Sequence, residues 1–179
     1  MGNKLTVFID TNVFLDFIER RPVGVKEAHA IFRLAANRCV DMQVSDLSIA
    51  NIKYSSRKAI PLQDFYKIMK LSREFYSIVP VGEQAVDRAL AIEAKDFEDA
   101  LQFFAAEQAG AQVIVTRNVK DFVFADTVEV LEPHDFLSKY FPRKPVACLT
   151  SFGTARCALV RPLPLTNWHG VWGGSACWC

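Results

Sequence analysis

The sequence lacks any apolar run of the roughly 18 residues that a membrane-spanning helix requires. It also lacks a P-loop, a Gly-x-Ser-x-Gly motif and a dinucleotide-binding fingerprint. Its three histidines, His29, His134 and His169, show no catalytic spacing. The first residues have neither the apolar segment nor the cleavage site of a signal peptide, so we expect a cytoplasmic protein without membrane contact.

The chain also has little net charge, with 21 basic and 20 acidic residues and a formal charge of +1 at pH 7. The balance is uneven, because residues 1–142 hold all 20 acids but only 17 of the bases. The protein is therefore not a basic nucleic-acid coat protein. Any nucleic acid that it handles must meet a local basic patch or bridging metal ions.

The composition changes after residue 142. Residues 143–179 contain all three tryptophans, four of the five cysteines, no acid and no periodic apolar pattern. We interpret this tail as a frameshifted or read-through extension of a domain that spans residues 1–142. A natural disordered extension is one alternative. A metal site that includes His169 is another, although Cys177-x-Cys179 lacks the spacing and the second pair of a structural zinc site. We assign the tail no function.

Within residues 1–142, strand and helix patterns alternate. Short apolar or β-branched runs predict strands at about 5–9, 42–44, 77–79, 112–115 and 128–131. Helical spacing predicts helices starting near residue 12, at 25–37, from 47 to before Pro61, from Pro61 onward, and at 83–94, 98–109 and 135–140. This alternation predicts an α/β fold with a mostly parallel sheet of about five strands, covered on both faces.

Three aspartates fall where such a fold brings them to one edge of the sheet. Asp10 directly follows the apolar run Val7–Ile9, Asp99 lies in the first turn of the helix before the fourth strand, and Asp121 follows that strand. Taken singly, each acid has a simpler interpretation as a helix cap or a solvated surface charge. Because the carboxyl ends of parallel strands face one way, we expect all three in one crevice.

Clustered carboxylates repel one another and raise one another's pKa values. A divalent cation relieves that conflict, and oxygen ligands favour Mg²⁺ or Mn²⁺ over zinc. Such a metal can acidify a water molecule and neutralise charge on a phosphodiester. The pattern therefore points to a metal-dependent nuclease.

Three segments resemble motifs of the PIN domain family. Val7–Val13 (Val-Phe-Ile-Asp-Thr-Asn-Val) resembles its opening motif, Phe97–Gln102 its Asp-Ala-Leu helix start, and Ile114–Phe122 its final strand and Thr-Arg turn. The first motif alone is weak, but the three together are specific. The resemblance covers about residues 4–141 and excludes the tail.

The resemblance implies a three-layer α/β/α sandwich and Mg²⁺- or Mn²⁺-dependent cleavage of RNA that leaves 5′-phosphate ends. Many small members of this family are VapC-like toxins, so the resemblance also implies a partner antitoxin and a homodimer. Carried over by position, Asp10 is the first metal acid and Asp99 the third. Thr11, Asn12 and Thr116 shape the pocket.

Two positions depart from the family pattern. The second acid, commonly Glu, is Asn51 here, and the fourth is Asn118, with Asp121 three residues further on. Asparagine can ligate a metal through its carbonyl oxygen but brings no charge. We predict that Asp121 takes the fourth role. Asp96, one turn before the third acid, is either a compensating ligand or a solvated helix-start acid.

Basic residues accompany these acids. Lys53, Arg57 and Lys58 share a predicted helix with Asn51, and Arg117 and Lys120 flank the last acid. They are candidates to hold RNA phosphates beside the metal, and the alternative is a solvated helix surface.

Two other functions compete with the ribonuclease. A non-catalytic PIN-like module would bind RNA or protein without turnover, which the two asparagines favour. A phosphatase of the haloacid-dehalogenase type also places an aspartate after its first strand, as a covalent nucleophile. That family needs a second aspartate two residues on, where this chain has Asn12, and a lysine motif that is missing here.

Overall fold

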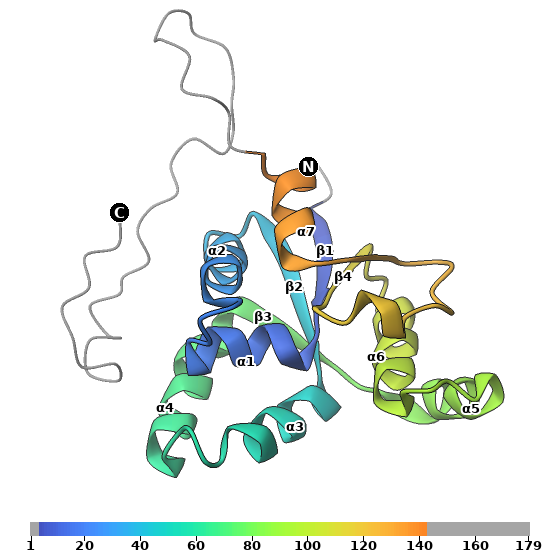
Figure 1. Cartoon of the computed structure of the whole chain (residues 1–179), viewed down its shortest axis with the longest axis horizontal. Coiled ribbons are helices and arrows are strands. Elements are labelled where there is room, and N and C mark those ends of the chain that lie inside the picture. The colour runs from blue at the N-terminus through green and yellow to red at the C-terminus, as the bar shows by residue number, and fades with distance from the viewer. Residues whose placement is uncertain (1–3, 143–179) are drawn as a thin grey trace, which may run out of the picture.

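The computed structural model describes residues 4–142, which form five strands, seven α-helices and two short 3-10 helices (Figure 1). Residues 143–179, and with them the interpretation of the tail, lie outside the described residues. In chain order the elements are β1 (Leu5–Ile9), α1 (Thr11–Glu19), α2 (Val25–Ala36), β2 (Val40–Ser45), α3 (Asp46–Ser56), α4 (Leu62–Ser72), η1 (Arg73–Phe75), β3 (Tyr76–Val79), α5 (Gly82–Ile92), α6 (Phe97–Gln108), β4 (Val113–Val115), η2 (Val119–Asp121), β5 (Glu129–Leu131) and α7 (Pro133–Tyr140).

The five strands form one parallel sheet in the order β3-β2-β1-β4-β5. This arrangement confirms the predicted α/β class and the parallel sheet. The chain first builds outward from β1 to β3 and then returns to place β4 on the other side of β1. The strand order therefore reverses between β1 and β4, and ligands of open α/β folds bind outside the strand ends at such a point.

Side chains alternate between the two faces of the sheet, as strand geometry requires. Val7 and Ile9 of β1 pack into a core cluster with α1, α2, α4 and α7, whereas Phe8 packs with α5 and α6 on the opposite face. Figure 1 shows α5 and α6 on the opposite side of the sheet from α1 and α2. Two apolar clusters thus hold helices on both faces, which confirms the three-layer sandwich.

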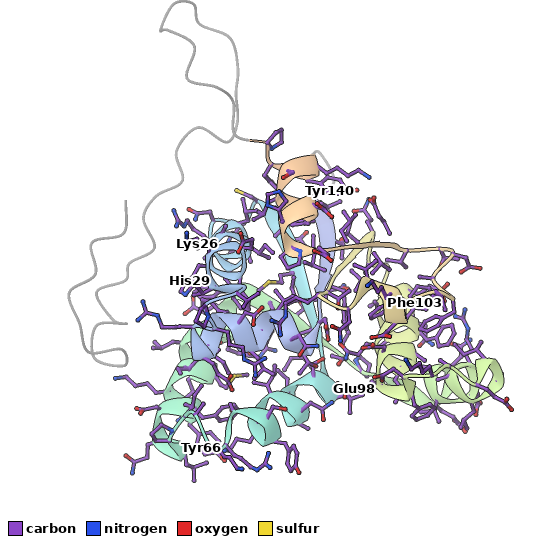
Figure 2. The ribbon with its side chains drawn as sticks, in the orientation of Figure 1. Lys26, His29, Tyr66, Glu98, Phe103 and Tyr140 are labelled. Carbon is purple, nitrogen blue, oxygen red and sulfur yellow. The ribbon has the colours of Figure 1, made fainter. Side chains whose placement is uncertain are left out.

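In the second core cluster, aromatic side chains of α6 pack against the face of the sheet that carries Phe8. Phe103, labelled in Figure 2, is buried in α6 and contacts Phe104 and Phe124 with its ring edge-on. Burying a ring of this size contributes about 2–3 kcal/mol. This packing fixes α6, and therefore the residues of its first turn, against the sheet.

The structure shifts several predicted boundaries by a few residues. The second strand runs over Val40–Ser45 rather than 42–44, because the polar Asp41 and Gln43 alternate with buried apolar residues. The helix after it ends at Ser56, which agrees with the predicted end before Pro61. Gly110 lies just after the C-cap of α6, where its φ of 71° suits glycine. Among residues 4–142, no helix is long and apolar enough to cross a membrane.

Candidate active site

The candidate site begins where β1 and β4 end side by side. Ile9 pairs with Val115 in the parallel register, and the backbone N–H of Asp10 donates to the carbonyl oxygen of Val115 at 3.1 Å. The next residue of each strand therefore reaches the same point. The hydroxyl of Thr116 donates to Oδ2 of Asp10 at 2.8 Å, and both side chains are buried. The structure thus brings together these two predicted site residues.

Asp10 is a buried carboxylate at the start of α1. Its side chain is 1% exposed and receives a longer hydrogen bond from Nδ2 of Asn12 at 3.4 Å. Burial raises the pKa of Asp10, because it removes water from the charged form. Hydrogen bonds from Thr116 and Gln102 act in the opposite direction by favouring that form. Burial thus disfavours the negative charge of Asp10 more than its hydrogen bonds stabilise it, and a bound cation would stabilise that charge.

Asp99 is the second buried acid, in the first turn of α6. It is 5% exposed, and its Oδ2 atom has no hydrogen-bond partner within residues 4–142. The pKa of Asp99 rises to about 7, first because of burial and then because of the negative charges of Asp10, Asp96, Asp121 and Glu98. A buried, unpartnered carboxylate oxygen among other acids fits a cation ligand.

Asp96 caps the same helix. Its Oδ1 atom accepts hydrogen bonds from the backbone N–H groups of Glu98 at 2.9 Å and Asp99 at 3.2 Å, and its side chain is exposed. The capping geometry satisfies backbone donors at the helix start. Asp96 therefore fixes the first turn of α6, and its role as a compensating metal ligand stays a prediction.

A buried polar network, which the sequence analysis did not identify, lies beside the two acids. Ser45 caps α3 and hydrogen-bonds Ser48 at 2.8 Å, and the Ser48 hydroxyl donates to Oε1 of Gln102 at 3.2 Å. Nε2 of Gln102 then donates to Oε1 of Glu98 at 3.2 Å, which also accepts from the hydroxyl of Thr11 at 3.4 Å. The network joins the starts of α1, α3 and α6, which Figure 1 shows near the same end of the sheet.

Two of the three remaining predicted acids and amides have interactions with the site residues. Asp121 is half-buried in η2, and its charge raises the pKa of Asp99. Asn51 is half-buried on α3, one turn after Ser48. Asn118 has an exposed side chain, and its backbone N–H donates to Oγ1 of Thr116 at 3.0 Å. Metal ligation by these three residues stays a prediction.

Arg117, a predicted RNA-binding residue, pairs with a buried acid within the chain. Its Nε atom lies 3.3 Å from Oδ2 of Asp16, whose side chain is 1% exposed. The pKa of Asp16 is raised by burial, which Arg117 and Arg21 partly offset. Gly24 packs so closely on Asp16 that an added Cβ would lie 2.0 Å from that Oδ2 atom. This ion pair ties the turn after β4 to α1.

Of the other predicted RNA-binding residues, Lys53 is half-buried and Arg57 is exposed. Lys53 lies over the ring of Phe65 at 5.1 Å, and Arg57 over that of Tyr54 at 3.9 Å. Lys58 and Lys120 are exposed. Lys53 and Arg57 therefore make cation–π contacts, whereas Lys58 and Lys120 are exposed to solvent.

The residues present fit a divalent cation, although their side chains are not yet arranged around one. Within the described part of the chain, no three His, Cys, Asp or Glu side chains form a ready metal-binding group. Even so, Asp10 and Asp99 are both buried, and the charge of Asp10 raises the pKa of Asp99. Oδ2 of Asp99 has no hydrogen-bond partner among residues 4–142. An oxygen-only donor set of this kind suits Mg²⁺ or Mn²⁺.

Comparisons with known proteins agree with this fold. The sequence model of the PIN domain family matches residues 6–120. Ribonuclease VapC1 of Aquifex aeolicus is 31% identical over 149 residues, which cover 77% of this chain and 97% of that protein.

Solved structures with the same fold include a DNA-bound VapBC from Salmonella typhimurium, with a TM-score of 0.56 and 18% identity over 72% of this chain and 98% of that one. VapBC2 from Rickettsia felis, bound to a fragment of promoter DNA, has a TM-score of 0.55 and 15% identity over the same shares.

Proposed function

Because the chain belongs to the PIN domain family, we propose that it is a metal-dependent endoribonuclease and the toxin of a toxin–antitoxin pair. The observation that carries the proposal is the pair of buried acids, Asp10 and Asp99, at the reversal point of a parallel sheet. The relative named Ribonuclease VapC1 supports the reaction class. The charge conflict within the site supports the need for a metal.

Asp10 and Asp99 would hold the cation, Mg²⁺ or Mn²⁺, with Asp121 as a further ligand. When bound, such a cation lowers the pKa of a water molecule and neutralises charge that develops on a phosphodiester. Thr116 orients Oδ2 of Asp10 and Gln102 restrains the same side chain, so the first acid needs little rearrangement. Fixed ligands of this kind hold the reacting groups in place before the reaction begins.

The RNA strand needs cationic contacts next to these acids, since the domain itself is net negative. Lys58 and Lys120 are exposed and free to approach phosphates, while Lys53 and Arg57 extend over aromatic rings on α3 and α4. Each phosphate contact makes binding weaker as salt rises. We therefore expect substitution of Lys58 or Lys120 by Gln to weaken RNA binding and to lower its salt dependence.

The proposed partner is an antitoxin protein, and the proposed oligomer is a homodimer that acts in the cytoplasm. The solved VapBC complexes support a protein partner by their shared fold. An antitoxin that covers the acids would keep the nuclease inactive.

The test is cleavage of a mixed structured RNA pool by the full chain with Mg²⁺, Mn²⁺ or EDTA. An Asp10→Asn/Asp99→Asn double variant is compared with Asp87→Asn, the same change at an exposed position of α5. We expect metal-dependent cleavage by wild type and by Asp87→Asn, and none by the double variant. Equal cleavage by all three proteins, or cleavage in EDTA, would contradict the proposal.

A non-catalytic binding module is the second candidate, because asparagines stand at positions 51 and 118 in place of the family's acids. It predicts that folded protein binds RNA or a partner without metal-dependent turnover. Membership of the PIN domain family leaves no support for the phosphatase alternative.

A further inference from the structure

We propose that Glu98 is a further ligand-bearing carboxylate of the metal site and supplies the charge that Asn51 does not. The inference rests on the proposed function, since it concerns the same cation. The family pattern places its second acid on α3, at Asn51, and assigns no role to Glu98. The structure instead offers a carboxylate from α6 on the same side of the site.

The contacts of Glu98 orient its side chain toward the two buried acids. Its Oε1 atom accepts from the hydroxyl of Thr11, the residue after Asp10, and from Nε2 of Gln102, one turn later on α6. Gln102 also lowers the pKa of Asp10, so the amide that holds Glu98 acts on the first buried acid as well. Figure 2 labels Glu98 where α6 begins, near the starts of α1 and α3. Glu98 is therefore held at the acids by two donors rather than extended into solvent.

One oxygen of Glu98 remains available for a cation. Both hydrogen bonds end on Oε1, and Oε2 accepts none from residues 4–142. Asp99, the next residue along the helix, offers a second open oxygen, because its buried Oδ2 atom has no hydrogen-bond partner in the described part of the chain. In Glu98 one carboxylate oxygen is fixed and the other is left open, which is the arrangement expected of a carboxylate that ligates a metal through one atom.

Asn51, which stands at the position of the family's second acid, lies one turn after a residue that is linked to Glu98 by hydrogen bonds. Ser48, one turn before Asn51 on α3, donates to Oε1 of Gln102, which itself holds Glu98. The hydrogen bonds therefore run from the helix that has lost its acid to the helix that carries Glu98. A neutral Asn51 leaves the site one negative charge short, and Glu98 restores that charge from α6.

The test measures Mn²⁺ affinity directly, by titration calorimetry on the full chain, and so has a readout besides activity. Glu98→Gln keeps the size of the side chain and removes its charge. The matched control is Glu83→Gln, the same change in the first turn of α5, where the side chain is exposed. We expect Glu98→Gln to weaken Mn²⁺ binding at least about tenfold and Glu83→Gln to leave it unchanged.

A second variant asks whether the charge can return from the family's usual position. Asn51→Glu combined with Glu98→Gln puts the carboxylate back on α3, and we expect Mn²⁺ affinity to recover toward the wild-type value. If Glu98→Gln binds Mn²⁺ as tightly as wild type, Glu98 is not a ligand and the inference is overturned. A melting temperature that falls while the affinity stays constant would likewise show a structural role only.

Glu98→Asp keeps the test decisive if the Gln variant does not fold. It preserves the charge and retracts the carboxylate by one methylene group, so we again expect weaker Mn²⁺ binding, whereas wild-type affinity would overturn the inference. Failure of the proposed function looks different, because wild-type protein would then bind no Mn²⁺ at all.

Discussion

The hydroxyl of Thr116 donates to Oδ2 of Asp10 at 2.8 Å and accepts from the backbone N–H of Asn118 at 3.0 Å. One side chain thus joins the end of β1 to the turn after β4. This contact lowers the pKa of Asp10 against the larger, opposite effect of burial. It is the shortest hydrogen bond to that carboxylate, and the first prediction concerns it.

Replacing Thr116 by Val removes the hydroxyl and keeps the shape of the side chain. We expect Mn²⁺ affinity to fall about tenfold, because an unsupported Asp10 holds its proton more tightly and orients less well. Thr116→Ser retains the hydroxyl and serves as the control, with affinity close to wild type. Calorimetric titration of both variants checks this, and equal binding by Thr116→Val and wild type would contradict it.

The second prediction concerns pH. The pKa of Asp99 is about 7 in the folded protein against 3.8 ordinarily, so the folded state holds a proton that the unfolded state has released. The contribution of Asp99 to stability is therefore greatest at low pH and is lost as pH rises from about 4 to about 7. Metal binding runs the other way, because the cation must displace that proton.

Asp99→Asn removes this titration. In metal-free protein at pH 8, we expect the variant to be more stable than wild type by at least about 1 kcal/mol, a rise in Tm of ~2–4 °C. At pH 5 the difference should shrink. Thermal unfolding in EDTA at both pH values measures it, with Asp87→Asn as the exposed control. A variant that is less stable than wild type at pH 8 would show that the buried charge of Asp99 does not destabilise the metal-free protein.

The third prediction concerns the ion pair of Asp16 and Arg117. Arg117→Met leaves Asp16 buried without its cation, and we expect a loss of about 2–4 kcal/mol in the free energy of unfolding. The pair of Lys4 and Asp41, also 3.3 Å apart but exposed, is the control, and Lys4→Met should cost less than about 0.5 kcal/mol. Urea denaturation compares the two. Equal small losses would show that the buried pair contributes no more than a surface one.

The fourth prediction uses Gly24, whose φ of −127° any residue can adopt. Gly24→Ala should nevertheless destabilise the fold by about 1–3 kcal/mol, because the new methyl group meets the Asp16 carboxylate. Combining it with Asp16→Ala opens the space, so the double variant should lose less than the sum of the two single changes. Strict additivity in urea denaturation would mean that the two residues do not compete for space.

Much of the fold and part of the site follow from sequence pattern. Short apolar or β-branched runs that alternate with helical segments predict the parallel sheet, because parallel neighbouring strands need crossover connections such as helices between them. Asp10 and Thr116 each directly follow such a run, so their convergence at the strand ends can be predicted before the strand order is known. The strand order itself, with β1 at the centre, depends on long-range pairing.

The contacts that the sequence analysis missed are those between segments far apart in the chain. Gln102 lies among buried apolar residues of α6, and only its spacing of four from Glu98 gives a local signal. Its links to Ser48 and Asp10 require the packed structure. Asp16 gives a signal of another kind, since it is an acid within the apolar run Val13–Ile18. The sequence shows that such an acid needs a partner but does not identify Arg117.

The most direct test of the account is the position of a bound cation. Crystals of the full chain grown with Mn²⁺ give an anomalous difference map that locates the ion independently of activity. We predict a peak about 2.0–2.3 Å from one carboxylate oxygen of Asp10 and one of Asp99. No peak at saturating Mn²⁺, or a peak away from both aspartates, would contradict the claim that these buried acids form a metal centre.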